Sequence, residues 1–120
     1  MSVKAITKFM AALIVLGLLT GCALGDADLA WQKINEENAM LVDVRSMEEY
    51  DHGHVPGAKL IPLDQVEARL SEFGTDKSAP IVFYCKRGVR ADRAKEILVE
   101  NGFLNVTNGG GYDDMMDAKP

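Results

Sequence analysis

Two patterns of apolar and polar residues alternate along the chain after residue 27. Short, mainly apolar runs occur at 40–44, 59–61, 81–84 and 103–107, and such runs are typical of strands buried on both faces of a sheet. Apolar residues at helical spacing occur over 28–37, 64–73 and 91–100, and shorter helical segments are expected after Ser46 and over 112–117. Since strands alternate with helices, we expect an α/β domain of three layers, in which helices flank a central, mainly parallel sheet.

Residues typical of helix ends mark the boundaries of these segments. Asp28 and Asp64 are expected to cap the N-termini of their helices. Ser46 and Glu49 have the spacing of a capping box, in which each side chain bonds the backbone N–H of the other residue. Residues 108–111, which include three glycines, are predicted to form a turn after the last strand.

The N-terminus has the pattern of an export signal. Two lysines precede an apolar stretch over 9–19, which is shorter than the roughly 20 residues that span a bilayer. The sequence Leu19-Thr20-Gly21-Cys22 then resembles a bacterial lipobox, in which cleavage before the cysteine leaves it as a lipid-modified N-terminus. An ordinary export signal, with a cysteine there by chance, is the alternative.

This resemblance implies a division of the chain and a location. We expect a lipoprotein signal over 1–21, a lipidated Cys22 and tether over 22–27, and a folded domain over 28–120. Lipid anchoring would place the domain in the bacterial envelope, facing the periplasm. By analogy with enteric bacteria, Ala23 after the cysteine favours the outer membrane, whereas an ordinary signal would give a soluble periplasmic protein.

Charge narrows the range of partners. Removal of residues 1–21 takes away two lysines and no acidic residue, so the 13 basic residues become 11 against 18 acidic ones, a net charge of −7. Such an acidic protein is not expected to bind nucleic acid. The acidic residues are spread over the predicted helices, as on an ordinary solvated surface.

Cys85 is the candidate nucleophile. With Cys22 lipidated, it is the only thiol of a protein exported to an oxidising compartment, where structural cysteines occur in pairs. A lone cysteine at the end of an apolar strand is commonly a small buried hydrophobe. Here, however, a loop with three basic residues and then a helix follow at once, and this environment favours the reactive thiolate. We therefore expect a reactive cysteine, with an intermolecular disulfide as the alternative.

The loop after Cys85 has the composition of an anion-binding site. Its backbone N–H groups and the N-terminus of the next helix would stabilise negative charge. Basic side chains in the loop would attract and orient an anion through charge and guanidinium hydrogen bonds. The residues expected to bind the anionic substrate are Arg45, which follows another strand at the same edge of the sheet, and Lys86, Arg87, Gly88, Val89 and Arg90.

Several ordered motifs surround this loop. Before it stand Leu41-Val42-Asp43-Val44-Arg45, Glu49-Tyr50 and a Gly-His-Val-Pro-Gly-Ala segment, and after it stands Gly110-Gly111-Tyr112. Together with the Cys-x-x-Gly-x-Arg loop, these motifs resemble the single-domain rhodanese-like sulfurtransferase family over roughly residues 41–114. The resemblance implies a rhodanese-like fold and a persulfide on Cys85. The loop is one residue shorter than the Cys-x5-Arg loop of phosphatases and arsenate reductases, which favours sulfur transfer over phosphoryl transfer.

The resemblance also implies supporting roles. In the family the loop arginine usually pairs with a glutamate before an aromatic residue, which here means Arg90 with Glu49. Arg45 is expected to support the loop and to lie within reach of the donor. Asp43, an acid inside an apolar strand, requires hydrogen bonds and is expected to brace the loop or its neighbours. Tyr112 stands where the family commonly has tryptophan and is expected to line the pocket.

The expected function is that of a monomeric envelope sulfurtransferase without a cofactor. It would move sulfane sulfur from thiosulfate or a similar anionic donor to cyanide or another thiophilic acceptor. His52 and His54 share a turn without further ligands nearby in the sequence, so no metal site is expected. The alternative is a non-enzymatic rhodanese-like module that binds a partner or senses redox state through Cys85, because a reactive thiolate is also readily oxidised.

Overall fold

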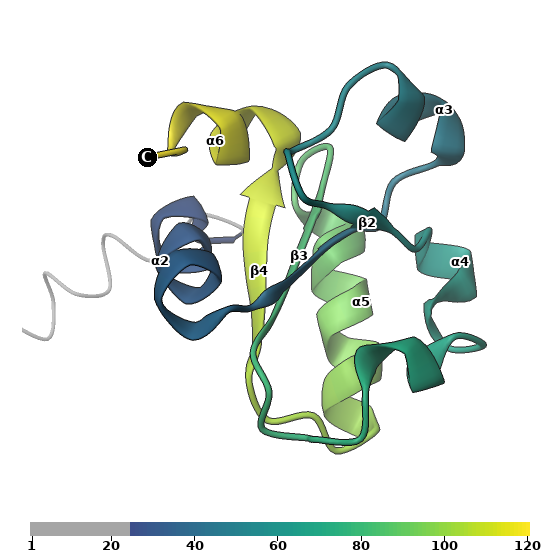
Figure 1. Ribbon diagram of the computed structural model, residues 1–120. Helices are drawn as coiled ribbons and strands as arrows, with labels where there is room; N and C mark the ends of the chain where they lie inside the picture. Colours follow the sequence, from purple (N-terminus) through teal and green to yellow (C-terminus); the bar gives the residue numbers. More distant parts are fainter. Residues whose placement is uncertain (1–24) are drawn as a thin grey trace, which may run out of the picture.

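Four parallel strands form the centre of the computed structural model, which describes residues 25–120 (Figure 1). They pair in the order β2-β1-β3-β4, with the bounds Met40–Asp43 for β1, Lys59–Leu60 for β2, Ile81–Cys85 for β3 and Val106–Gly111 for β4. Every neighbouring pair runs parallel, so the carboxyl ends of all four strands lie at one edge. The predicted export signal and the lipidation site Cys22 lie outside the described residues.

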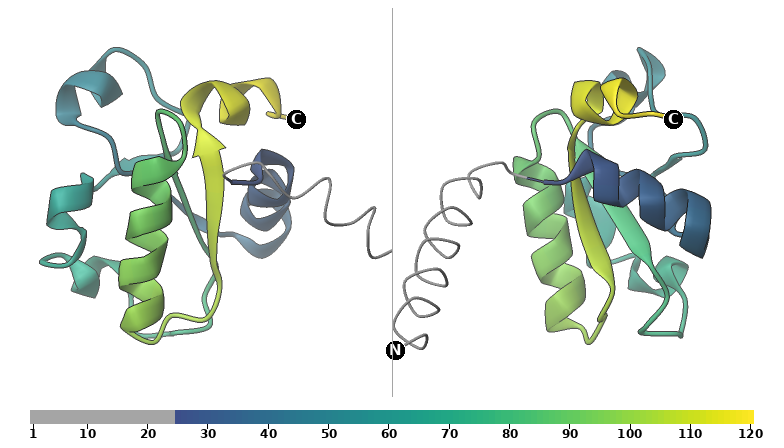
Figure 2. Two further views of the ribbon diagram at one scale, coloured as in Figure 1. Left: turned by 180° about the vertical axis from the view of Figure 1, so that it is seen from behind. Right: turned by 90° about the vertical axis from the view of Figure 1, so that its left-hand side faces the viewer.

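Helices cover both faces of this sheet (Figures 1 and 2). One face carries α2 (Ala27–Glu37) and α6 (Tyr112–Asp117). The other carries α4 (Leu63–Val66), the 3-10 helix η1 (Leu70–Phe73) and α5 (Val89–Glu100). The short α3 (Met47–Asp51) follows β1 beyond the carboxyl edge. The predicted three-layer α/β fold is therefore confirmed. Within residues 25–120, no helix has both the length and the apolar character needed to cross a membrane.

Alternate residues of β3 enter two separate cores. Val82 and Tyr84 pack in the core beneath α2 and α6, whereas Ile81, Phe83 and Cys85 pack in the core beneath α5. All five are at most 1% exposed, as expected for a central strand covered on both faces. The side chain of Cys85 therefore lies on the face of the sheet that α5 covers.

The helix boundaries agree with the sequence predictions in part. The Ser46–Glu49 capping box is present at the start of α3, as predicted. The N-terminus of α2 is capped by Asp26 and not by Asp28, because the chain enters the helix two residues earlier. Asp64 does not cap α4, which begins after Pro62 and has no side-chain cap. The helix predicted over 64–73 is broken into α4 and η1.

The last strand is shifted relative to the prediction. Residues 103–105 are not part of β4, since the Phe103 N–H bonds the carbonyl of Leu98 at the end of α5. Residues 108–111 are a strand and not a turn. They pair with β3 across a bulge, in which the partner changes from Phe83–Asn108 to Cys85–Gly111. This shift brings residues 108–111 beside the loop of residues 86–88, the active loop, and sequence alone did not predict it.

Candidate active site

Cys85 ends β3 and lies beneath a short loop that leads into α5. The residue is 1% exposed, and it is the free cysteine of the described residues. The backbone N–H of Gly88 donates a hydrogen bond of 2.9 Å to its sulfur. Because α5 begins at Val89, this N–H lies at the N-terminus of a 12-residue helix, where the helix dipole places partial positive charge. The predicted order of strand, cysteine, loop and helix is present.

Gly88 has a conformation that a glycine adopts without strain. Its φ angle is +96°, in the left-handed region. Its carbonyl accepts a hydrogen bond of 2.9 Å from the side-chain amide of Asn108 in β4. The Asn108 side-chain oxygen accepts one of 2.8 Å from the N–H of Gly110, so both ends of the buried amide are used. Asn108 was not singled out in the sequence, because it lies in the segment predicted to be a turn.

Gly111 allows the end of β4 to approach the same loop. A Cβ atom at this position would lie 2.4 Å from the carbonyl oxygen of Lys86, which is too close for any side chain. Its N–H donates a hydrogen bond of 3.0 Å to Asp114, which helps α6 to begin directly after the strand. The late glycines therefore permit close packing beside the active loop.

The expected pair of Glu49 and Arg90 is present. The Arg90 guanidinium donates two hydrogen bonds, of 2.7 and 3.0 Å, to the two carboxylate oxygens of Glu49. Hydrogen bonds from Arg90 and then from Ser46 hold the pKa of Glu49 at about 2, despite partial desolvation. The pair therefore joins α3 to the first turn of α5.

Asp43 and Arg45 form a buried ion pair at the end of β1. The Arg45 side chain donates to both oxygens of Asp43 at 2.8–3.1 Å, and its backbone N–H donates to one of them at 2.9 Å. The hydroxyl of Tyr84 donates a hydrogen bond of 2.6 Å to Asp43 and accepts one from the backbone of Val55. Burial raises the pKa of Tyr84, and the bond to Asp43 raises it further. Asp43 therefore joins β1 to β3, which fits the bracing role expected for it.

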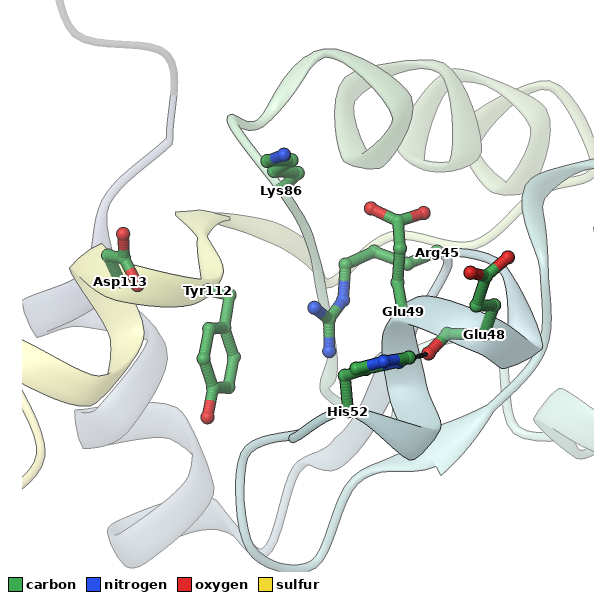
Figure 3. A pocket seen from close by; sticks show the side chains of 7 residues that line it. All are labelled: Arg45, Glu48, Glu49, His52, Lys86, Tyr112 and Asp113. Carbon is green, nitrogen blue, oxygen red and sulfur yellow. Dashed lines mark hydrogen bonds between the residues drawn. The ribbon is translucent and has the colours of Figure 1, made fainter.

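An open pocket of about 380 Å³ adjoins the loop (Figure 3). The ring of Tyr112 lies 4.8 Å from the Arg45 guanidinium, and both residues line the pocket, as expected for Tyr112. The remaining lining residues are Glu48, Glu49, His52, Lys86 and Asp113.

The predicted substrate-binding residues are placed differently around this pocket. Lys86 and Arg45 line it. Arg87 is exposed on the loop and Gly88 is buried at its end. Val89 is exposed at the first position of α5, and Arg90, which follows it, is held by Glu49. Lys86 and Arg87 are therefore the exposed basic groups of the loop, whereas Arg45 and Cys85 are buried.

The two histidines of the turn have contacts within the protein. The ring of His54 stacks on that of Tyr50 with centroids 3.7 Å apart, and its Nδ1 is 2.9 Å from the Tyr50 carbonyl oxygen. His52 Nδ1 is 2.7 Å from the carbonyl oxygen of Glu48. Over residues 25–120 there is no group of three or more His, Cys, Asp or Glu side chains arranged to hold a metal ion.

Comparison with known proteins relates this site to one family. Residues 26–118 match the family model of the rhodanese-like domain. Thiosulfate sulfurtransferase PspE of Escherichia coli is 42% identical over 78 residues, which are 65% of this chain and 75% of that protein. YqhL of Bacillus subtilis is 43% identical over 75 residues, which are 62% of this chain but only 58% of that protein.

Comparison with solved structures finds the same fold. A rhodanese with anions from E. coli superposes with a TM-score of 0.60 at 41% sequence identity, covering 63% of this chain and 89% of that one. Since the family model matches nearly all of the residues that the structure describes, the chain belongs to the rhodanese-like domain family.

Proposed function

We propose that this protein is a thiosulfate sulfurtransferase that carries sulfane sulfur as a persulfide on Cys85. The observation that carries the proposal is the 2.9 Å hydrogen bond from the Gly88 N–H to the Cys85 sulfur, at the start of α5 and beneath a basic loop. This is an arrangement for an anionic sulfur nucleophile. The name of the relative PspE, a thiosulfate sulfurtransferase, supports the same activity.

The first half-reaction is attack of the Cys85 thiolate on the outer sulfur of thiosulfate. A sulfur–sulfur bond forms to Cys85, the sulfur–sulfur bond of thiosulfate breaks, and sulfite leaves with the bonding electron pair. In the second half-reaction, cyanide or another thiophile attacks the outer sulfur of the persulfide. Thiocyanate then leaves when cyanide is the acceptor, and the Cys85 thiolate is restored with its electron pair. Neither half-reaction needs an external oxidant or reductant.

Each part of the loop has a task in this cycle. Lys86 and Arg87, both exposed, attract the anionic donor to the loop. The Gly88 N–H stabilises negative charge on sulfur before attack and again when the thiolate is restored. Arg90 is occupied by Glu49, so its role in the proposal is to hold the shape of the loop.

We also propose that the domain works in the bacterial envelope as a lipoprotein anchored through Cys22, facing the periplasm. The support is the sequence Leu19-Thr20-Gly21-Cys22 after a short apolar segment. Metabolic labelling with a fatty acid, compared between the full-length protein and its Cys22→Ala variant, tests this. Labelling that persists in the variant would contradict the anchor.

Intact-mass measurement of the domain without residues 1–22 tests the reaction. Thiosulfate should add one sulfur atom that maps to Cys85, and cyanide should remove it. The Cys85→Ser variant should gain no sulfur. A folded, reduced domain that takes up no sulfur would instead favour a binding or redox-sensing module, and stable oxidation of Cys85 in cells would identify the redox sensor.

A further inference from the structure

The pocket beside the loop contains two carboxylates that the proposed cycle with thiosulfate does not use. Glu48 and Asp113 line it, and neither has an ion-pair partner among residues 25–120. Two other charged lining residues do have ion-pair partners. Glu49 is paired with Arg90, and Arg45 is paired with Asp43 outside the pocket lining. Lys86 is the remaining basic residue of the lining, and it too has no ion-pair partner over the same range.

Both carboxylates belong to helices that are fastened to the active loop. Glu48 precedes Glu49, whose two hydrogen bonds from Arg90 tie α3 to the start of α5. Asp113 is in the first turn of α6, two residues after Gly111, which packs against the Lys86 carbonyl. Figure 3 shows the two carboxylates on opposite sides of Arg45 and Tyr112, with Lys86 on the loop above. The fold therefore sets where the two helices lie relative to the loop, and both carboxylate side chains extend from them as exposed groups.

This distribution of charge suits a molecule different from thiosulfate. A small dianion gains from Lys86 but is repelled by two carboxylates. The volume of about 380 Å³ is in the range of pockets that hold organic ligands, far more than a five-atom anion needs. The rings of Tyr112 and His52 also offer surface to carbon atoms.

We infer that this pocket selects, as the acceptor of the Cys85 persulfide, a small organic thiol that carries a cationic amine. The inference rests on the proposed function. The acceptor thiolate would lie near Lys86 and its carbon chain against Tyr112, with its ammonium attracted by the negative charges of Glu48 and Asp113. The thiolate attacks the outer sulfur of the persulfide, the sulfur–sulfur bond to Cys85 breaks, and the Cys85 thiolate leaves with the electron pair. The products are the persulfide of the acceptor and the free enzyme.

A purely structural role for the carboxylates makes a different prediction. Glu48 and Asp113 both lie in the first turns of their helices, where a negative charge stabilises the helix N-terminus. If that were their whole role, their replacement would lower stability and would change the rates with all acceptors by one common factor.

Variants Glu48→Gln, Asp113→Asn and their combination separate these two roles. The persulfide is formed with thiosulfate and discharged by 2-aminoethanethiol, 2-mercaptoethanol or mercaptoacetate, which are cationic, neutral and anionic. Comparing each variant with wild type for the same thiol cancels the intrinsic reactivity of that thiol. We expect kcat/KM for 2-aminoethanethiol to fall about two- to threefold for each carboxylate removed, as for unit charges several ångströms apart in a water-filled pocket.

The other acceptors define the specificity of the effect. The kcat/KM for the neutral thiol should be unchanged. Mercaptoacetate, an anionic acceptor, and thiosulfate, the anionic donor, should both react faster with the variants than with wild type. All of these differences should shrink at high salt, because salt screens charges in an open pocket. The matched control is Glu36→Gln, which removes an exposed carboxylate of α2 outside the pocket and should change none of the rates.

The outcomes that overturn the inference are distinct from failure of the proposed function. Suppose that the wild-type protein transfers sulfur to cyanide while the substitutions change kcat/KM for all three thiols by the same factor. In that case the inference about the acceptor is wrong and the proposed function stands. If thiosulfate places no sulfur on Cys85 of the wild-type protein, the proposed function fails and the inference fails with it.

Discussion

The side-chain amide of Asn108 donates a hydrogen bond of 2.9 Å to the carbonyl oxygen of Gly88, which connects β4 to the loop after Cys85. The N–H of the same Gly88 binds the Cys85 sulfur. Asn108 thus binds the carbonyl of Gly88, whose N–H binds the sulfur of the proposed nucleophile. It touches neither the sulfur nor the proposed substrate pocket, so we regard it as a positioning residue.

Replacement of this residue should loosen the loop. Asn108→Ala leaves the Gly88 carbonyl and the Gly110 N–H without their side-chain partner, and we expect a loss of about 1–3 kcal/mol in the free energy of unfolding. The rate of sulfur loading from thiosulfate should fall more than the affinity for it. Urea unfolding and time-resolved intact mass measure the two effects. Asn105→Ala removes an amide that bonds Lys33 away from the loop and should load sulfur at the wild-type rate.

Gly111→Ala should displace the loop by direct collision. The added methyl group would lie 2.4 Å from the Lys86 carbonyl, although the φ angle of −90° is ordinary for alanine. We expect at least tenfold slower sulfur loading and a loss of about 1–3 kcal/mol in stability. Gly102→Ala is the matched control, since it has a φ angle of +91° but open space around the new methyl group. It should cost about 1 kcal/mol and leave the loading rate unchanged.

The Glu49–Arg90 pair should make stability depend on acid pH. Because the pKa of Glu49 is about 2 in the folded protein and 4.5 is its ordinary value, the folded state binds fewer protons between these pH values. The stabilisation is therefore complete above pH 4.5 and is lost as the pH falls toward 2. Both side chains are about one-third exposed, so solvent screening limits the pair to about 1 kcal/mol.

Unfolding in urea at several pH values tests this pair. The stability difference between wild type and Glu49→Gln should be about 1 kcal/mol near pH 6, and it should narrow between pH 4.5 and 2. A difference that stays constant over this range would show that the charge of Glu49 contributes nothing to folding.

Asp43→Asn should destabilise the fold more than the loss of a neutral hydrogen bond does. The substitution leaves the buried Arg45 guanidinium without its carboxylate, which we expect to cost about 3–5 kcal/mol. Tyr84→Phe removes only a hydroxyl from the same network and should cost about 1–3 kcal/mol. Thermal or urea unfolding compares the two variants. Equal losses of stability in the two variants would show that the charge of Asp43 contributes no more to folding than the hydrogen bond from the Tyr84 hydroxyl.

The amino-acid sequence by itself determined the features that depend on neighbours along the chain. The alternation of buried strands and amphipathic helices predicted the layers. The three-residue spacing of Ser46 and Glu49 predicted the capping box that they form. The apolar strand before Cys85 and the basic loop after it predicted the order of strand, cysteine, loop and helix. In each case the physical cause acts within one turn or one strand, so it is visible in the order of residues. The pairing of Glu49 with Arg90, by contrast, was expected only from the resemblance to the family.

Only the tertiary structure decided the features that join distant segments. The bulged pairing of β4 with β3 replaced a predicted turn and brought Asn108 and Gly111 to the loop, because ladder hydrogen bonds and close packing outweighed the local turn preference of glycine. The tyrosine hydroxyl that completes the Asp43 network comes from β3, 41 residues away. Glu48 and Asp113 face one pocket because α3 and α6 are both fastened to one loop. Such contacts depend on how the strands and helices pack together, and no local pattern of residues contains that information.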